Sequence, residues 1–314
     1  MTDSSVRYVL VDVFADRPLA GNPLAVFPDA RGFDEATLQL VSREMDHAAT
    51  AFLFPAALEG AAFRLRIFSR EREIPFAGHP ALGAHYVHAT ETRRPLVEPI
   101  TRVAHEGKDG LFDVELVVEN GRIGLVRLTQ REPSIGPKLA SDEVADVAEA
   151  LGLAEEEIQA TNQPVQVAST GLPVLIVPVA TLPALFAARP RYDLLRGLLE
   201  GRDATLVYAF TKETRDAHSA AHARAFDTVG SVEVPGAGAA AAALAAYLVS
   251  NNAVTIQPVT VLPVEQGHTV NRPSTIYTEV HFAEGEIARV VMGGRVVRIG
   301  EGKLEIQRGS SPPS

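Results

Sequence analysis

Residues 74–87, IPFAGHPALGAHYV, decide how this chain folds. An apolar strand, Phe63–Phe68 (FRLRIF), runs up to this stretch, and an Ala- and Leu-rich helix begins after Gly78. Pro80 fits the first helical position, where its missing N–H removes no hydrogen bond. Free N–H groups at a helix start can hold an anion or a carboxylate, and His79 beside them can titrate near neutral pH. The same pattern also describes an ordinary helix start with a capping histidine.

A second stretch, Glu233–Tyr247 (EVPGAGAAAAALAAY), has the same design of strand, Gly/Pro turn and small-residue helix. Helices this rich in alanine can pack very closely. Two of them with facing N-termini would form one anion-holding cleft between two half-molecules. We therefore expect substrate contacts from the residues at both helix starts, which are Gly78, Pro80, Gly236, Ala237, Gly238 and Ala239.

Composition bounds the functional class. The 314 residues are enough for two domains of about 150 residues each. The formal charge of −10 argues against nucleic acid or an acidic membrane as the main partner. The sequence contains no cysteine, which removes disulfides, thiol catalysis and Cys-ligated metal. No apolar run approaches the ~20 residues of a membrane span, and no signal peptide is evident, so a cytoplasmic protein is expected.

The order of elements predicts an α+β protein with two similar halves. Asp34 is a good N-cap for a helix over residues 35–45, and Ser141 is expected to cap a later helix that Gly152 ends. The Pro- and Gly-rich segment 131–138 marks the best boundary. We expect a first domain at 1–130, completed by the C-terminal strand, a second domain at 131–305, and a flexible tail at 306–314.

Common catalytic and cofactor motifs are missing from the sequence. It has no Walker loop, no HExxH, no GxSxG elbow and no strand–GxGxxG–helix unit. His218 and His222 lie four residues apart, a spacing that would suit a metal on a helix, but no third ligand is evident nearby. Two solvated histidines are the favoured interpretation of that pair.

Carboxylate and imidazole chemistry remains, with Glu44 and His79 as the candidate acid and base. Glu44 falls near a helix end, where its charge opposes the helix dipole. In a dry cleft its pKa would rise, and it could then accept and donate protons near pH 7. On spacing alone, an ordinary exposed helix residue explains Glu44 better.

Motifs spread along nearly the whole chain resemble the PhzF-like isomerase family of phenazine biosynthesis. They are Gly21-Asn22-Pro23, Arg43-Glu44, FAGHPALG at 76–83, Thr170-Gly171-Leu172-Pro173, Glu265-Gln266-Gly267 and Arg272-Pro273-Ser274. The resemblance implies the diaminopimelate-epimerase fold, with two pseudo-symmetric halves that each wrap a barrel-like sheet around a central helix. It also implies an active cleft between the halves, a homodimer, and no cofactor or metal. Asn22 and Asp46 would join the substrate contacts.

The chain departs from the family pattern in both halves. The family glutamate lies in a motif Glu-x-Asn-x-Ser-Glu-Thr, which reads here Glu44-Met45-Asp46-His47-Ala48-Ala49-Thr50. The later motif Glu-Asp-Pro-Ala-Thr-Gly-Ser has Val234 for its aspartate and Ala239 for its serine. A site built for an amine and a hydroxyl would lose affinity for such a substrate without these partners.

The sequence therefore predicts a cofactor-independent isomerase that shifts a proton, and with it a double bond, in a small unsaturated cyclic carboxylate of secondary metabolism. Glu44 would carry the proton, and His79 with the helix N–H groups would hold the substrate. A cysteine-based epimerase is excluded by composition. Two alternatives stay open: a catalytically silent relative that binds a small ligand or a partner, and a lyase or hydratase that uses the same glutamate.

Overall fold

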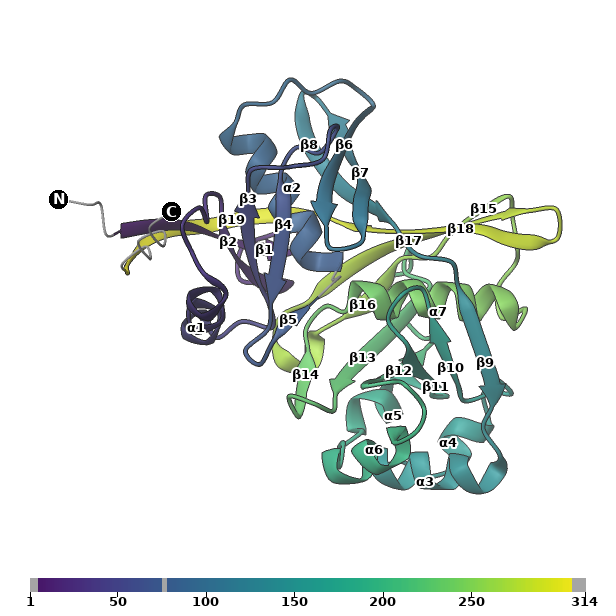
Figure 1. Cartoon of the computed structure of the whole chain (residues 1–314). Helices are drawn as coiled ribbons and strands as arrows, with labels where there is room; N and C mark the ends of the chain where they lie inside the picture. The colour runs from purple at the N-terminus through teal and green to yellow at the C-terminus, as the bar shows by residue number, and fades with distance from the viewer. Residues whose placement is uncertain (1–4, 75–77, 307–314) are drawn as a thin grey trace. The chain divides into compact units, whose positions relative to one another are not determined.

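Two central helices, α2 (Gly78–Glu91) and the alanine-rich α7 (Gly238–Ser250), organise the fold. A computed structural model of the chain describes residues 5–74 and 78–306 (Figure 1). The chain divides into unit 1, residues 1–128 and 293–314, and unit 2, residues 129–292. Each unit holds one of the two helices.

Unit 1 carries a curved sheet around α2. Its strands and its second helix are β1 (Ser5–Val13), β2 (Asn22–Phe27), β3 (Thr50–Phe54), β4 (Arg64–Phe68), β5 (Glu73–Ile74), β6 (Ile100–Gly107), β7 (Gly110–Glu119), β8 (Arg122–Thr129), β19 (Val296–Glu305) and α1 (Glu35–Met45). The helix α2 contacts β1, β2, β3, β4, β7 and β19. The strands of unit 1 thus surround this helix from several sides.

Unit 2 repeats the arrangement around α7, which contacts β10, β11 and β17. Its elements are β9 (Ser134–Lys138), α3 (Ser141–Leu151), α4 (Glu156–Gln159), β10 (Gln166–Ser169), β11 (Val174–Pro178), α5 (Leu182–Ala187), α6 (Tyr192–Leu199), β12 (Leu206–Thr211), β13 (Ala221–Asp227), β14 (Val232–Val234), β15 (Val259–Val261), β16 (Val264–Gln266), the 3₁₀ helix η1 (His268–Val270), β17 (Ser274–Ala283) and β18 (Glu286–Gly294).

Strand pairing shows that the two units share one topology. In unit 1, β1–β2 is antiparallel, β2–β3 parallel and β3–β4 antiparallel; in unit 2, β10–β11, β11–β12 and β12–β13 follow the same order. Next, β4 pairs with β5 in antiparallel fashion and with β6 in parallel, as β13 does with β14 and β16. The two central helices follow the equivalent strands β5 and β14. The prediction of two pseudo-symmetric halves is confirmed.

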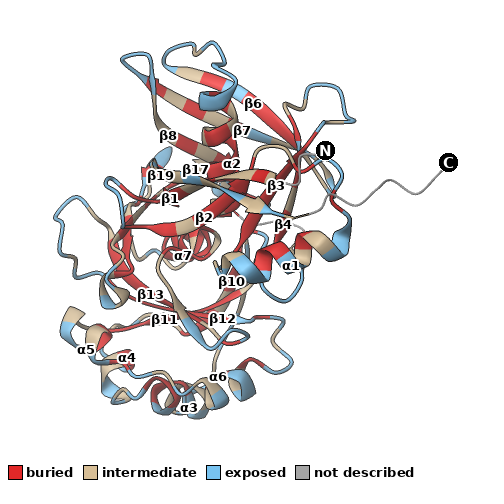
Figure 2. Cartoon of the chain, turned by 90° about the vertical axis from the view of Figure 1, so that its left-hand side faces the viewer, coloured by how far each residue is buried: buried red, intermediate tan, exposed pale blue. Residues whose placement is uncertain are grey.

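Small side chains let each sheet close on its helix. The ten residues 240–249 of α7 are all buried, which is why the helix needs alanine on every face (Figure 2). In α2, a Cβ placed on Gly83 would lie 2.4 Å from Cδ2 of Leu24 and 3.2 Å from Cγ2 of Val11. A larger residue at position 83 would push α2 away from β1 and β2.

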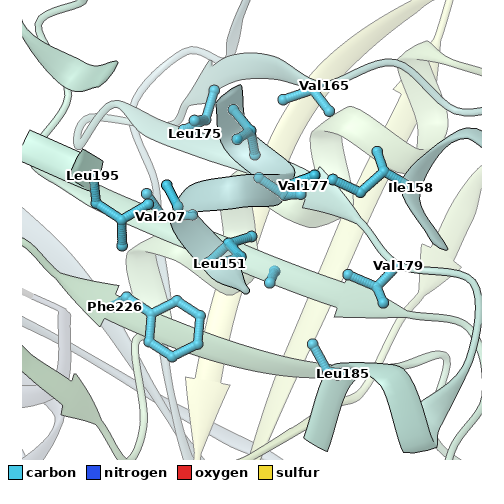
Figure 3. Packing of buried hydrophobic residues seen from close by; sticks show 14 of the residues in the cluster. Leu151, Ile158, Val165, Leu175, Val177, Val179, Leu185, Leu195, Val207 and Phe226 are labelled. Carbon is cyan, nitrogen blue, oxygen red and sulfur yellow. The ribbon is translucent and has the colours of Figure 1, made fainter. Parts of the chain in front are cut away.

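A second core in unit 2 lies between its sheet and the helices α3–α6 (Figure 3). Leu151 and Leu195 pack there with Leu175, Val177 and Phe226. Pro190 lies between α5 and α6 and separates these two helices.

The predicted helix caps are confirmed except for one. Asp34 accepts a hydrogen bond from the Thr37 N–H at 2.8 Å, and Gly152 ends α3 with φ +65°. Ser141 was expected to cap α3, but the N-cap is Ala140, whose N–H donates to the Glu143 carboxylate at 2.8 Å. A carboxylate in the first turn thus replaces the expected hydroxyl cap.

The last strand, β19, pairs antiparallel with β1 and belongs to unit 1. Unit 1 therefore includes a C-terminal strand, and unit 2 ends at Met292 rather than at residue 305. Ile306, the first residue of the predicted tail, packs partly buried against the core of unit 1. Residues 307–314 of that tail lie outside the described residues.

Candidate active site

His79 is the second residue of α2, and one nitrogen of its imidazole is left without a hydrogen-bond partner in the part of the chain that the structure describes. Nε2 of His79 is buried and has no hydrogen-bond partner among the described residues. Burial, together with the nearby charge of His47, lowers the pKa of His79 to about 3. The positive end of the helix dipole also disfavours an imidazolium here. His79 is therefore neutral at pH 7, and its flanking residues Gly78 and Pro80 are buried.

A neutral imidazole at a helix start can stabilise negative charge that develops on a substrate. It donates a hydrogen bond from one nitrogen while the helix N–H groups contribute their dipoles. Enzymes that abstract a proton beside a carboxylate or carbonyl pair such a neutral histidine with a carboxylate base. His79 fits the first of these two roles.

Glu44 lies at the end of α1, and its side chain is exposed. The buried face of α1 carries Leu38, Val41 and Ser42, and Glu44 points away from that face and is exposed. Unit 1 alone does not enclose Glu44, and the dry cleft expected between the two halves stays a prediction. Its role as proton carrier stays a prediction.

Asp46 ends α1 in the left-handed conformation, with φ +53°. It is exposed and forms an ion pair with Arg70, so a described partner already holds its carboxylate. His47, the next residue, lies close enough to His79 to influence its pKa. Sequence reasoning missed His47 because the family motif leaves that position variable.

Two further polar residues of unit 1 are buried. Asn22, at the start of β2, is 1% exposed. Thr50, the threonine that ends the glutamate motif, starts β3, and its Oγ1 is buried with no hydrogen-bond partner among the described residues. Burying a hydroxyl without a partner is costly. The orphaned atoms of Thr50 and His79 are therefore candidates for contacts with a bound ligand.

In unit 2, the start of α7 is positioned by a buried glutamine. Gln266 accepts hydrogen bonds from the Ala237 N–H at 3.2 Å and the Tyr208 hydroxyl at 3.0 Å, and it donates to the Val234 carbonyl at 2.6 Å. Gly236 and Gly238 are buried, and Ala239 is half-buried. Val234 and Ala239 bring no polar side-chain atoms to this helix start, as the sequence predicts.

A second group of titratable residues lies elsewhere in unit 2. Nδ1 of His222 lies 2.6 Å from Oε2 of Glu265, and both residues are buried. Burial alone would raise the pKa of Glu265, but hydrogen bonds from His222 and from the Arg215 and Asp216 N–H groups lower it to about 2. The carboxylate is therefore ionised at neutral pH.

The interpretation of His218 and His222 as two solvated histidines holds for His218 and is wrong for His222, which is buried. The alternative of a metal pair on one helix is not formed, because the two residues share no helix. His218 is exposed, with its N–H donating to Oδ1 of Asp216 at 2.9 Å, whereas His222 lies on β13. Within residues 5–74 and 78–306, no cluster of three or more His, Cys, Asp or Glu residues is placed to hold a metal ion. Among the described helices, none has the length and apolar composition needed to cross a bilayer.

Comparisons of the sequence and of the structure with known proteins show the family of this chain. Residues 11–302 match the model of the family described as phenazine biosynthesis-like protein. The chain is 34% identical to an uncharacterized isomerase of Mesorhizobium japonicum, covering 96% of this chain and 99% of that protein. It is 30% identical to the trans-2,3-dihydro-3-hydroxyanthranilate isomerase of Pseudomonas fluorescens, covering 95% and 99%. The PhzF-family phenazine biosynthesis protein of Bacillus anthracis shares the fold, with a TM-score of 0.85 at 23% identity over 96% and 99% of the two chains.

Proposed function

This chain belongs to the phenazine biosynthesis-like family and is an isomerase, and on that basis we propose that it moves a proton within a small unsaturated cyclic carboxylate. The observation that carries the proposal is the neutral His79 with its buried, unpaired Nε2 at the start of α2. A carboxylate substrate would meet the free N–H groups of α2 there. His79 would stabilise the negative charge that develops when a proton leaves carbon.

Glu44 is the proposed acid and base that removes this proton and returns it at a conjugated carbon. Its exposure means that the substrate itself would have to exclude water from the carboxylate. A proton-shift isomerase that works in this way needs no cofactor. We also propose that the enzyme acts as a cytoplasmic homodimer, without nucleic-acid or membrane partners, and light scattering on the purified protein would test the dimer.

Deuterium exchange tests the reaction. The protein would be incubated in deuterium oxide with trans-2,3-dihydro-3-hydroxyanthranilate, the substrate in the name of the Pseudomonas fluorescens relative. NMR and mass spectrometry would then locate deuterium on ring carbons. We expect incorporation by the wild type and its loss in Glu44→Gln. Glu156→Gln, which changes an exposed carboxylate in the first turn of α4, serves as the matched control. Full activity in Glu44→Gln would refute the proposed role of that glutamate.

His79→Leu probes the second role in the same assay, because leucine has no hydrogen-bond donor. Removing one donor that stabilises an oxyanion lowers a rate by about 10²- to 10³-fold, and we expect a loss of that size. Undiminished exchange in His79→Leu would contradict the role given to the imidazole.

A catalytically silent binder is the second candidate, because Val234 and Ala239 have replaced two polar family residues and Glu44 is exposed. Such a protein would bind the ligand, as shown by calorimetry, without exchanging any carbon-bound hydrogen. A lyase or hydratase would be recognised in the same experiment, because its product would differ in mass from the substrate by a lost or gained group.

A further inference from the structure

Two histidine nitrogens of unit 2 are buried and unpaired, and the proposed reaction uses neither of them. Nε2 of His222 on β13 and Nδ1 of His268 in η1 have no hydrogen-bond partners among the described residues. The two rings face each other, with centroids 4.8 Å apart and planes inclined by 45°. His222 is 0% exposed and His268 is half-buried, so the pair is reached from the His268 side.

Glu265 determines which ring nitrogen of His222 carries the proton. Its carboxylate accepts hydrogen bonds from the Arg215 N–H at 3.0 Å and the Asp216 N–H at 2.5 Å, and Oε2 lies 2.6 Å from Nδ1 of His222. Because an ionised carboxylate only accepts hydrogen bonds, Nδ1 must carry the proton that it shares with Glu265. Nε2 of His222 is then the ring nitrogen left to act as a ligand, and the His268 ring is its aromatic neighbour, with centroids 4.8 Å apart.

Comparing equivalent positions in the two pseudo-symmetric units distinguishes the role of Glu265 from that of His222. In unit 1, Glu106 occupies the position equivalent to Glu265 and accepts the N–H groups of Ala57 and Leu58 at 2.6 and 2.9 Å. Anchoring a loop thus explains the carboxylate in both halves. The strand partner of Glu106 is Arg64, however, whereas that of Glu265 is His222. Loop anchoring accounts for neither the imidazole nor the second histidine that faces it.

We propose that His222 Nε2 and His268 Nδ1 together bind a divalent transition-metal ion such as Zn²⁺, Cu²⁺ or Ni²⁺. Neutral imidazole nitrogens are preferred ligands of these ions. A ligating histidine commonly donates its other N–H to a carboxylate, which is the arrangement of His222 and Glu265. Two protein ligands leave the remaining coordination positions to water or a small anion, in agreement with the lack of a three-residue cluster among the described residues. The family resemblance implies no such metal.

Zinc titration of the metal-free, full-length protein tests the site. The protein would be stripped with a chelator, exchanged into clean buffer and titrated in competition with a chromophoric zinc indicator. We expect one Zn²⁺ per chain in the wild type and loss of that binding in His268→Gln. A carboxylate that accepts a hydrogen bond from a metal-ligating histidine contributes about 10- to 100-fold in metal affinity, so we expect Glu265→Gln to weaken binding by that factor.

Matched controls come from the structure itself. Glu106→Gln removes the equivalent loop anchor in unit 1 and should leave zinc affinity unchanged, and so should His218→Gln, which changes an exposed histidine. In the wild type, the EPR spectrum of bound Cu²⁺ should show coupling to two nitrogens. His268 is half-buried, so His268→Gln is expected to fold, as circular dichroism would verify, even if His222 variants do not.

Three results would overturn the proposal. One is the absence of zinc binding by the wild type, which would leave a bridging water as the simplest partner of the two nitrogens. Another is binding that His268→Gln does not reduce. The third is an equal loss of affinity in Glu265→Gln and Glu106→Gln, because loop anchoring would then explain the effect of Glu265.

Discussion

Mild acid should destabilise unit 1 through a buried pair of histidines. Nε2 of His85 on α2 lies 3.0 Å from Nδ1 of His105 on β6, and the two residues are 1% and 3% exposed. The His105 ring stacks on Phe112, with centroids 5.3 Å apart, and on Phe63 at 6.1 Å. A hydrogen bond between two imidazoles requires one to donate and the other to accept, so the pair is stable while both rings are neutral.

The size of the effect follows from the pKa of His105. Burial lowers this pKa from an ordinary 6.5 to about 4. Because the folded-state pKa lies below the unfolded one, stability is complete above pH 6.5 and falls as the pH drops from 6.5 toward 4. A difference of about 2.5 pKa units corresponds to about 3 kcal/mol at 1.36 kcal/mol per unit. Burial and the neighbouring His105 also lower the pKa of His85, which adds to the loss.

Urea unfolding at several pH values between 7 and 4.5 measures this dependence. The matched comparison is the double variant His85→Leu/His105→Phe, which keeps an aromatic ring between Phe63 and Phe112 but has no titrating group in the pair. Carboxylates titrate alike in both proteins, so the difference between the two pH profiles isolates the histidines. Parallel profiles between pH 6.5 and 4.5 would refute the reasoning.

Two packing predictions can be checked by the same unfolding method. Gly83→Ala should be about 1–3 kcal/mol less stable than Gly197→Ala. The gain in helix propensity is common to both variants, but a Cβ on residue 83 meets atoms within 4 Å whereas a Cβ on residue 197 meets none among the described residues. Equal stabilities of the two variants would argue against the close packing of α2. Arg224→Leu should cost about 3–5 kcal/mol, because the buried guanidinium donates two hydrogen bonds to Glu233. Arg31→Leu, which breaks an exposed ion pair, should leave the unfolding midpoint unchanged, and similar losses in both variants would contradict this account.

The fold could be predicted from the sequence because local patterns and topology agree. The stretches at 78–91 and 238–250 are predicted as helices because both follow a short strand and a Gly/Pro turn. Asp34 marked the start of α1 for a local reason, a side chain that bonds the third N–H of the helix. The affiliation of β19 with unit 1 agrees with the expectation that the C-terminal strand completes the first domain, and it depends on pairing with β1 at the other end of the chain. The residue at which the chain passes from unit 2 to unit 1 could not be predicted, because no local pattern marks it.

The candidate site was predictable only in part. The position of His79 at a helix start could be predicted, because the signal for that start lies in the adjacent residues Gly78 to Pro80. The exposure of Glu44 could not, because it depends on which face of α1 packs against the sheet. The pair of His222 with Glu265 joins residues far apart in sequence through the parallel register of β13 and β16. Spacing along the chain pointed instead to His218, which is near in sequence and is not part of the pair.

The most direct test of the central claim is deuterium incorporation into trans-2,3-dihydro-3-hydroxyanthranilate by the wild type and by His79→Leu, which removes the hydrogen-bond donor. The account predicts label at a ring carbon with the wild type and at least about a hundredfold slower labelling with the variant. Equal rates of labelling in the two proteins would contradict it. The absence of label with a folded wild type that binds the compound would show that the chain is a binder rather than a catalyst for this substrate.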